Sequence, residues 1–145
     1  MSTMDQGRLD ALLEFYQTLT AERIAGFDEF YAENAYFKDP FNEVRRLDDI
    51  KEIFSRMFRQ VADPRFLVKE HVGDMRGMFL IWDMSFRMKS WRPRESQIIR
   101  GVSHLRFGAD GKVVYHRDYW DTGEELYAKL PLLGAGVRLM RRLIG

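Results

Sequence analysis

The chain has 145 residues, of which 46% are hydrophobic and 14% aromatic, enough for one core but too few residues for a second independent domain. Its 23 Lys and Arg residues nearly balance its 22 Asp and Glu residues, so no overall field favours nucleic acid or an anionic membrane. The lack of cysteine excludes disulfides, thiolate nucleophiles and cysteine-based metal centres, and it agrees with the cytoplasm as the expected compartment.

The first 61 residues of the chain predict three helices. Apolar residues recur at helical spacing over residues 9–19 and 24–30, and Thr20 between them is a favoured N-cap residue. Residues 47–61 show the same spacing, with two aspartates in the first turn, where the helix dipole favours negative charge. We expect Asp63-Pro64 to end this third helix, because proline cannot continue it.

One short strand and a meander of four longer strands complete the pattern. Residues 35–37 are predicted as a strand that ends at Asp39-Pro40, since proline lacks the N–H that a strand ladder needs. From Phe66 onward the apolar residues alternate with a period of two, which is typical of strands. A turn at Gly108 to Gly111 joins the last two strands. The four predicted strands cover roughly residues 66–73, 78–90, 97–107 and 112–121.

These elements predict an α+β fold in which a cone-shaped, curved antiparallel β-sheet packs on three N-terminal helices, with a further helix at the C-terminus. We expect one domain over residues 1–145, with a core at about 9–121 and a helical extension at about 123–145. No apolar run reaches the length of about 18 residues that a membrane span needs, so we expect no integral membrane segment.

Two parts of the chain resemble a known superfamily. The segment from Tyr31 to Phe41, which includes Asp39-Pro40, resembles the ketosteroid isomerase segment that presents a catalytic aspartate just before a proline. The hairpin from Leu105 to Val113, followed by Tyr119-Trp120, is similar to the last hairpin of the same proteins. The resemblance covers most of residues 9–121 and points to the nuclear transport factor two-like superfamily, with its ketosteroid isomerases and SnoaL-like cyclases.

The resemblance implies an internal pocket with Asp39 as a general base and Trp120 as a pocket residue. The isomerases also use a tyrosine on the first helix and an acid on the third meander strand, and here those positions hold Phe15 and Ser103. Tyr16 replaces the tyrosine after a shift of one residue, but Ser103 is not acidic. Steroid isomerisation is therefore not the reaction that we expect.

Strand alternation adds a histidine and a second carboxylate to this set. If Trp120 faces the pocket, His116 and Asp118 share its face of the strand. Asp39 could then remove a proton beside a carbonyl group, while His116, held by Asp118, acts on the oxygen. In the alternative interpretation Asp39 caps a turn, and His116 and Asp118 form a structural pair or face outward. The predicted pocket walls are Tyr16, Trp82, Phe86, Ser103 and Trp120.

We therefore expect a SnoaL-like acid/base enzyme, such as an isomerase, cyclase or dehydratase, that acts on a small hydrophobic carbonyl compound without a cofactor. The alternative is a non-catalytic module of the same fold that binds a small ligand or a protein. We see no motif for a metal, a dinucleotide or nucleic acid. A homodimer is expected through the convex face of the sheet.

The C-terminal tail carries an apolar stripe of Leu133, Val137, Met140 and Ile144, and no acidic residue follows Glu125. Such a stripe is compatible with a lid, a partner-binding helix or a membrane-surface anchor. We expect instead that it packs on its own domain or on a second subunit, because amphipathic helices usually do. We also expect Pro131, Gly134 and Gly136 to interrupt the helix before residue 137.

Overall fold

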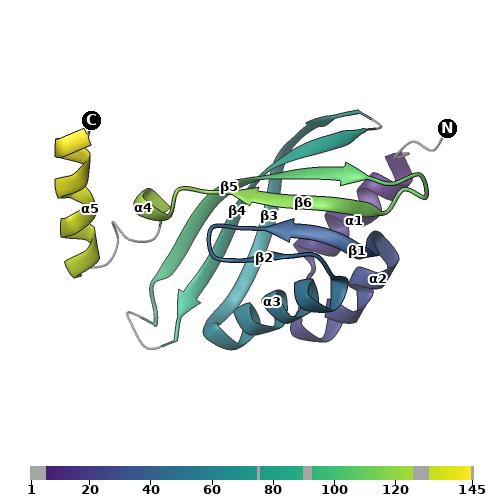
Figure 1. Ribbon diagram of the computed structural model, residues 1–145. Helices are drawn as coiled ribbons and strands as arrows, with labels where there is room; N and C mark the ends of the chain where they lie inside the picture. The colour runs from purple at the N-terminus through teal and green to yellow at the C-terminus, as the bar shows by residue number, and fades with distance from the viewer. Residues whose placement is uncertain (1–5, 75, 90–92, 126–130, 145) are drawn as a thin grey trace.

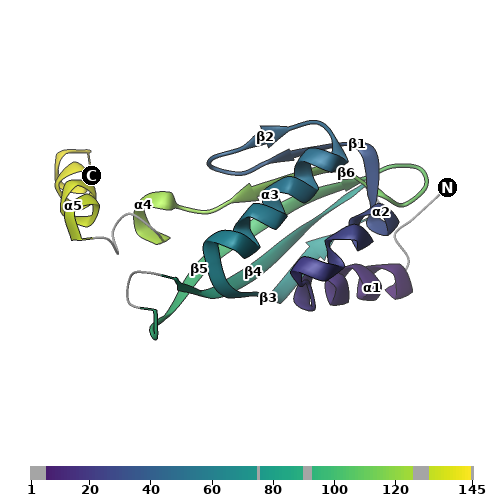
Figure 2. The ribbon, with the colours of Figure 1, turned by 90° about the horizontal axis from the view of Figure 1, so that it is seen from below.

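The computed structural model describes residues 6–74, 76–89, 93–125 and 131–144. It confirms the α+β fold: a twisted six-stranded sheet in the order β2-β1-β6-β5-β4-β3, with α1, α2 and α3 on one of its faces (Figures 1 and 2). The elements before the meander are α1 (Gln6–Gln17), η1 (Ala21–Gly26), α2 (Phe27–Phe30), β1 (Tyr31–Lys38), β2 (Glu43–Val44) and α3 (Leu47–Gln60). The later elements are β3 (Val61–Gly73), β4 (Gly77–Met88), β5 (Ser96–Phe107), β6 (Val113–Tyr119), α4 (Thr122–Glu125) and α5 (Pro131–Ile144).

The second predicted helix consists of two short pieces. Residues Ala21–Gly26 form the 3₁₀ helix η1, and Phe27–Phe30 add one turn of α-helix. Thr20 is the N-cap, as predicted, and its side chain accepts a hydrogen bond from the Arg23 N–H at 3.3 Å. This compact corner directs the chain straight from α2 into β1.

The first strand is longer than predicted and runs parallel to the last one. β1 pairs with β6 in parallel, with Phe37 opposite His116, so the sheet is mixed while its four-stranded meander is antiparallel as expected. A parallel pair between distant segments leaves no local turn signal in the sequence. The pairing places the end of β1, and Asp39 after it, beside the end of β6.

The prediction that Asp63-Pro64 ends the third helix is wrong. Helix α3 stops at Gln60, and β3 begins at Val61, so both residues lie within the strand. Asp63 has a φ of 49°, and the β3–β4 register shifts between Ala62 and Arg65. A proline is tolerated here because a bulge removes its position from the hydrogen-bonded ladder.

The meander itself is confirmed, although residue 90 of the second predicted strand lies outside the described residues. Gly108 closes the last turn by donating its N–H to the Lys112 carbonyl at 2.8 Å, and Gly111 supplies the positive φ of 81° that the turn requires. One face of β4 is buried against the helices, as the alternation predicts. Its buried residues are Met78, Leu80, Trp82, Met84 and Phe86.

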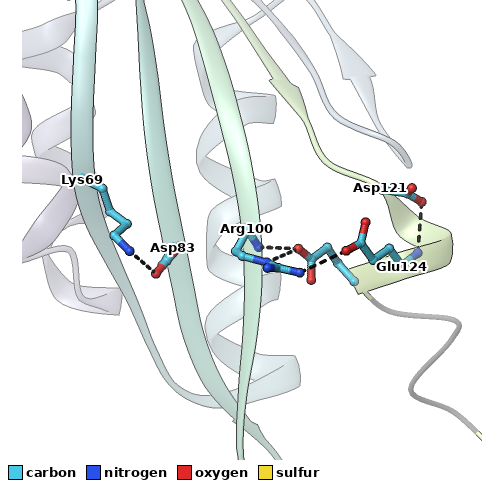
Figure 3. Close-up of polar contacts among 6 residues, drawn as sticks. Lys69, Asp83, Arg100, Asp121 and Glu124 are labelled. Carbon is cyan, nitrogen blue, oxygen red and sulfur yellow. Dashed lines mark hydrogen bonds and ion pairs between the residues drawn. The ribbon is translucent and has the colours of Figure 1, made fainter.

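Helix α4 is fixed to the sheet by Arg100 on β5. The Arg100 Nε donates to the buried carboxylate of Glu125 at 2.7 Å, and its Nη2 lies 3.1 Å from Glu124 (Figure 3). Asp121 accepts the N–H of Glu124 at 3.0 Å and so caps the start of the helix. The last described turn before α5 is therefore anchored to the sheet.

Helix α5 is continuous from Pro131 to Ile144, so the predicted interruption by Pro131, Gly134 and Gly136 is wrong. Proline fits the first position of a helix, where its missing N–H has no partner to lose. The side chains of Leu133 and Val137 lie outside the described set. Among the described residues, no helix is long and apolar enough to cross a membrane.

Candidate functional site

Two hollows meet at the carboxyl end of β6. An inner cavity of about 30 Å³ lies between the sheet and the helices, and its volume is close to that of one water molecule. An outer groove of about 420 Å³ runs past the ends of β1 and β6 and is lined by Asp39, Arg117 and Trp120, among others. Asp118 belongs to the lining of both hollows. The inner cavity is lined by Tyr16, Phe54, Phe66, Val68, Leu80, Trp82, Ser103, His116 and Asp118.

A chain of hydrogen bonds runs through the wall of the inner cavity. On one side of Asp118, His116 Nε2 lies 2.6 Å from its Oδ1, and His116 Nδ1 lies 2.6 Å from the Tyr31 hydroxyl. The Tyr31 hydroxyl is in turn 2.6 Å from that of Tyr16. On the other side, Ser103 Oγ donates to the same Asp118 Oδ1 at 2.5 Å. Trp82 Nε1 donates to Ser103 Oγ at 2.8 Å. Six side chains thus form one network.

The network leaves one oxygen of Asp118 without a donor. Ser103 and His116 both address Oδ1, and within the described residues no group donates to Oδ2. The Asp118 side chain is 15% exposed, whereas that of His116 is 4% exposed. Oδ2 therefore keeps free accepting capacity, on a residue that lines both hollows.

The protonation state of His116 sets the direction of the tyrosine hydrogen bonds. With neutral His116 and ionised Asp118, Nε2–H donates to the carboxylate, so Nδ1 must accept from Tyr31, and Tyr31 must accept from Tyr16. With His116 protonated, Nδ1–H donates to Tyr31, Tyr31 donates to Tyr16, and the Tyr16 hydrogen is free to point into the cavity. The same four side chains can therefore either withhold or present a donor.

The two phenols of the hydrogen-bonded network, Tyr16 and Tyr31, remain neutral over the ordinary pH range. Burial raises the pKa of Tyr16, with a smaller opposing effect from its hydrogen bond to Tyr31. Burial also raises the pKa of Tyr31 well above its usual value, and the neighbouring Tyr16 adds to the shift. Both groups therefore act as hydroxyl donors and acceptors.

Asp39 lies in the outer groove and is held by its own turn. Its Oδ1 accepts the backbone N–H groups of Phe41 at 2.8 Å and Asn42 at 2.7 Å, and the Asn42 side chain contacts both oxygens at 3.1 and 3.2 Å. Trp120 lies in the same groove with its ring edge-on to Phe41, 5.7 Å between centroids. No hydrogen bond joins Trp120 to Asp39 in the described part of the chain.

The other predicted site residues divide between the cavity and the core. Tyr16, Trp82, Ser103, His116 and Asp118 line the inner cavity. Phe86 is buried in the core and belongs to the lining of neither hollow.

Sequence reasoning missed Tyr31, the central member of the tyrosine pair. It begins β1, and only the parallel pairing of β1 with β6 brings it to His116. Its only sequence signal is a tyrosine in a predominantly apolar stretch of the segment that resembles the isomerases. Within the described residues, no group of three or more His, Asp or Glu side chains is arranged to hold a metal ion.

A sheet covered on one face by three helical segments is a fold shared with solved structures described as having a ketosteroid isomerase-like fold or as NTF2-like. Residues 12–116 match the model of the SnoaL-like domain. The match covers most of the chain, so the protein belongs to the SnoaL-like family.

Solved structures of low sequence identity share this fold. TsrD from Streptomyces laurentii has a TM-score of 0.72 at 17% identity, over 90% of this chain and 98% of that one. A protein with a ketosteroid isomerase-like fold from Catenulispora acidiphila, in complex with trimethylamine, has a TM-score of 0.70 at 11% identity over 85% and 92%. An LEH-like epoxide hydrolase from M. tuberculosis has a TM-score of 0.65 at 13% identity over 92% and 89%. No curated protein matches the sequence.

Proposed function

We propose that the protein is an acid/base enzyme of the isomerase, cyclase or dehydratase type, which acts on a small hydrophobic carbonyl compound and needs no organic cofactor. The observation that supports it is the hydrogen-bonded chain from Tyr16 through Tyr31 and His116 to Asp118. Its two end residues, Tyr16 and Asp118, line the same cavity. Acid and base groups fixed around one small space are what enolisation requires.

In this proposal Asp118 is the base. Its Oδ2 takes a proton from the carbon beside the carbonyl group, the C–H electron pair forms the enolate double bond, and the carbonyl oxygen gains negative charge. Tyr16, oriented by protonated His116 and Tyr31, donates a hydrogen bond to that oxygen. Ser103 holds the other oxygen of Asp118, so the base keeps one orientation. The proton then returns from Asp118 to carbon or to a leaving group.

The outer groove accommodates the body of the substrate. The inner cavity has room for little more than a carbonyl group, whereas the groove beside it is more than ten times larger. Trp120 and Pro40 offer apolar contact there, and Trp82 forms a wall of the inner cavity. Asp39 is the second candidate for the base, because its carboxylate lines the same groove as Asp118.

Exchange of the proton next to a carbonyl group tests the proposal before the natural substrate is known. A panel of hydrophobic ketones is incubated with the protein in D₂O, and NMR follows loss of the C–H signal. Asp118→Asn should slow exchange by about 10²–10⁴-fold, the usual contribution of a positioned acid or base, with ligand affinity little changed. Asp39→Asn keeps the oxygen that caps the turn and should slow exchange less than about tenfold.

An exposed aspartate provides the matched control. Asp48→Asn removes one carboxylate from the surface of α3, where the side chain lies 3.7 Å from Arg46, and it should leave exchange unchanged. A large loss in Asp39→Asn with little loss in Asp118→Asn would assign the base to Asp39. If the exchange rate were the same in wild type, in all variants and in protein-free solution, the proposed enzymatic function would be excluded.

The second candidate function is a non-catalytic binding module. The inner cavity is nearly filled, and in the described part of the chain no buried side-chain polar atom lacks a hydrogen-bond partner. Both observations are typical of a rigid core. This candidate predicts that ketones bind wild type and Asp118→Asn equally, with no proton exchange in either.

We also propose that the protein works as a homodimer in the cytoplasm, through the sheet face opposite the helices. Leu67 is 56% exposed and Phe79 45% exposed on this face, and Phe79 stacks on His104 with 4.5 Å between ring centroids. Sedimentation velocity should give a dimer for wild type and a monomer for Leu67→Asp/Phe79→Asp. A monomeric wild type at micromolar concentration would contradict the dimer.

A further inference from the structure

Helix α5 has two separate faces. At about 100° per residue, four exposed apolar side chains share an arc of about 140°, and three arginines share another arc of about 100°. The apolar face consists of Leu139, Met140, Leu143 and Ile144, and the arginine face of Arg138, Arg141 and Arg142. The helix is amphipathic without any acidic residue.

The apolar face does not pack on the domain. Leu143 is 77% exposed and Ile144 80% exposed, and Leu139 and Met140 are each more than half exposed. In both ribbon views α5 stands beyond α4, away from the sheet and from α1 to α3 (Figures 1 and 2). The expectation that its stripe packs on its own domain is therefore not met by the described residues. An apolar face of this extent needs a partner outside the domain.

The net positive charge of the chain lies on the same helix. Three of the 23 Lys and Arg residues lie on α5, and the rest of the chain has 20 cations against 22 acids. The three arginines form no ion pair with any described residue, in contrast to Arg100, which is held by Glu124 and Glu125 at the base of the tail. The helix is thus a cationic element on a slightly anionic domain.

We propose that α5 binds an anionic lipid surface, lying in the headgroup region with its apolar face toward the acyl chains. Its 14 residues span about 21 Å, shorter than the hydrocarbon core of about 30 Å, so it lies on the bilayer and does not cross it. Arginines beside an apolar arc can reach lipid phosphates while leucine, methionine and isoleucine side chains enter the interface. A protein partner would need acids that match three clustered arginines, whereas an anionic bilayer presents negative charge everywhere along the helix.

Vesicle flotation of the full chain tests the proposal. The protein should float with phosphatidylcholine vesicles that contain phosphatidylglycerol, should float poorly with phosphatidylcholine alone, and should be released by salt. Arg138→Gln/Arg141→Gln/Arg142→Gln should lower the partition coefficient roughly 100-fold, as loss of about 1 kcal/mol for each arginine implies. Leu139→Ser/Leu143→Ser should lower it as well, because the apolar face supplies the insertion energy.

A matched variant separates the effect of the α5 arginines on flotation from the effect of net charge. Arg46→Gln/Arg56→Gln/Arg76→Gln removes three exposed arginines outside α5 and should float like wild type. Failure of wild type to float at low salt, or equal flotation with both vesicle types, would overturn the proposal. The proposal would also be overturned if the wild-type protein did not float but formed a dimer that Leu139→Ser/Leu143→Ser dissociates. That result would identify a second copy as the partner of α5.

Discussion

The tyrosine pair is the residue-scale feature with the clearest pH signature. Burial raises the pKa of Tyr16 and Tyr31, whereas the same phenols in the unfolded chain ionise near about 10. The folded state therefore keeps protons that the unfolded state loses, and the free energy of unfolding should be unaffected below about pH 10 and fall as the pH rises above it. In an ultraviolet titration, one phase of tyrosinate absorbance should appear only as the protein unfolds. If this absorbance phase were still present in Tyr16→Phe/Tyr31→Phe, it could not be assigned to Tyr16 and Tyr31.

Gly101 on β5 offers a second residue-scale test. A Cβ at this position would lie 2.5 Å from the Trp82 ring, so Gly101→Ala must displace the indole whose N–H donates to Ser103. Overpacking of this kind costs about 1–3 kcal/mol, so the midpoint of thermal unfolding should fall and tryptophan fluorescence should change. Gly136→Ala is the matched control, because a Cβ there meets nothing within 4 Å. An unchanged midpoint in Gly101→Ala would show that Trp82 can move freely.

Strand alternation predicted the side chains that face the cavity better than it predicted their contacts. A period of two was enough to place Ser103, His116 and Asp118 together, since each lies on a long regular strand. It could not give the hydrogen bond between Tyr31 and His116, because these residues are 85 positions apart and meet only through the parallel pairing of β1 with β6. The turn at Asp39 was foreseen as one of two alternatives, and its four hydrogen bonds come from its own loop.

At the scale of elements, helix boundaries were the least predictable part of the fold. Apolar spacing identified α3, but its end lies before Asp63-Pro64, because a bulge lets β3 contain both residues. Similarly, Gly134 and Gly136 do not break α5. In both places the local preference of proline or glycine is outweighed by neighbouring pairing or by a continuous helical ladder.

Helix α4 is held to β5 by the contact between Arg100 and Glu125. Glu125 is 5% exposed, so Glu125→Ala removes a buried carboxylate that accepts hydrogen bonds from the Arg100 backbone N–H at 3.3 Å and from the Arg100 Nε at 2.7 Å. Amide hydrogen exchange over residues 122–125 should rise about tenfold, while exchange in β4 stays unchanged. Glu124→Ala is the control, because its carboxylate is 55% exposed and should matter little. Equal exchange in both variants would show that α4 is held by other contacts.

At the scale of the whole molecule, the hydrogen-bonded network of this SnoaL-like protein lies where sheet and helices meet, and its Asp118 also lines a larger groove. The sequence predicted this architecture because periodicity, turns and the aspartate-proline segment agree with one another. It could not predict how small the inner cavity is, since the same aromatic residues serve a filled core or an open pocket.

The most direct test of the acid/base account is a crystal structure of the protein with a bound hydrophobic ketone. The account predicts that the carbonyl oxygen lies about 3 Å from the Tyr16 hydroxyl, with the neighbouring carbon in contact with Asp118 Oδ2 and the body of the ligand along Trp120. A ligand confined to the outer groove against Asp39, with the Tyr16 cavity unchanged, would contradict it.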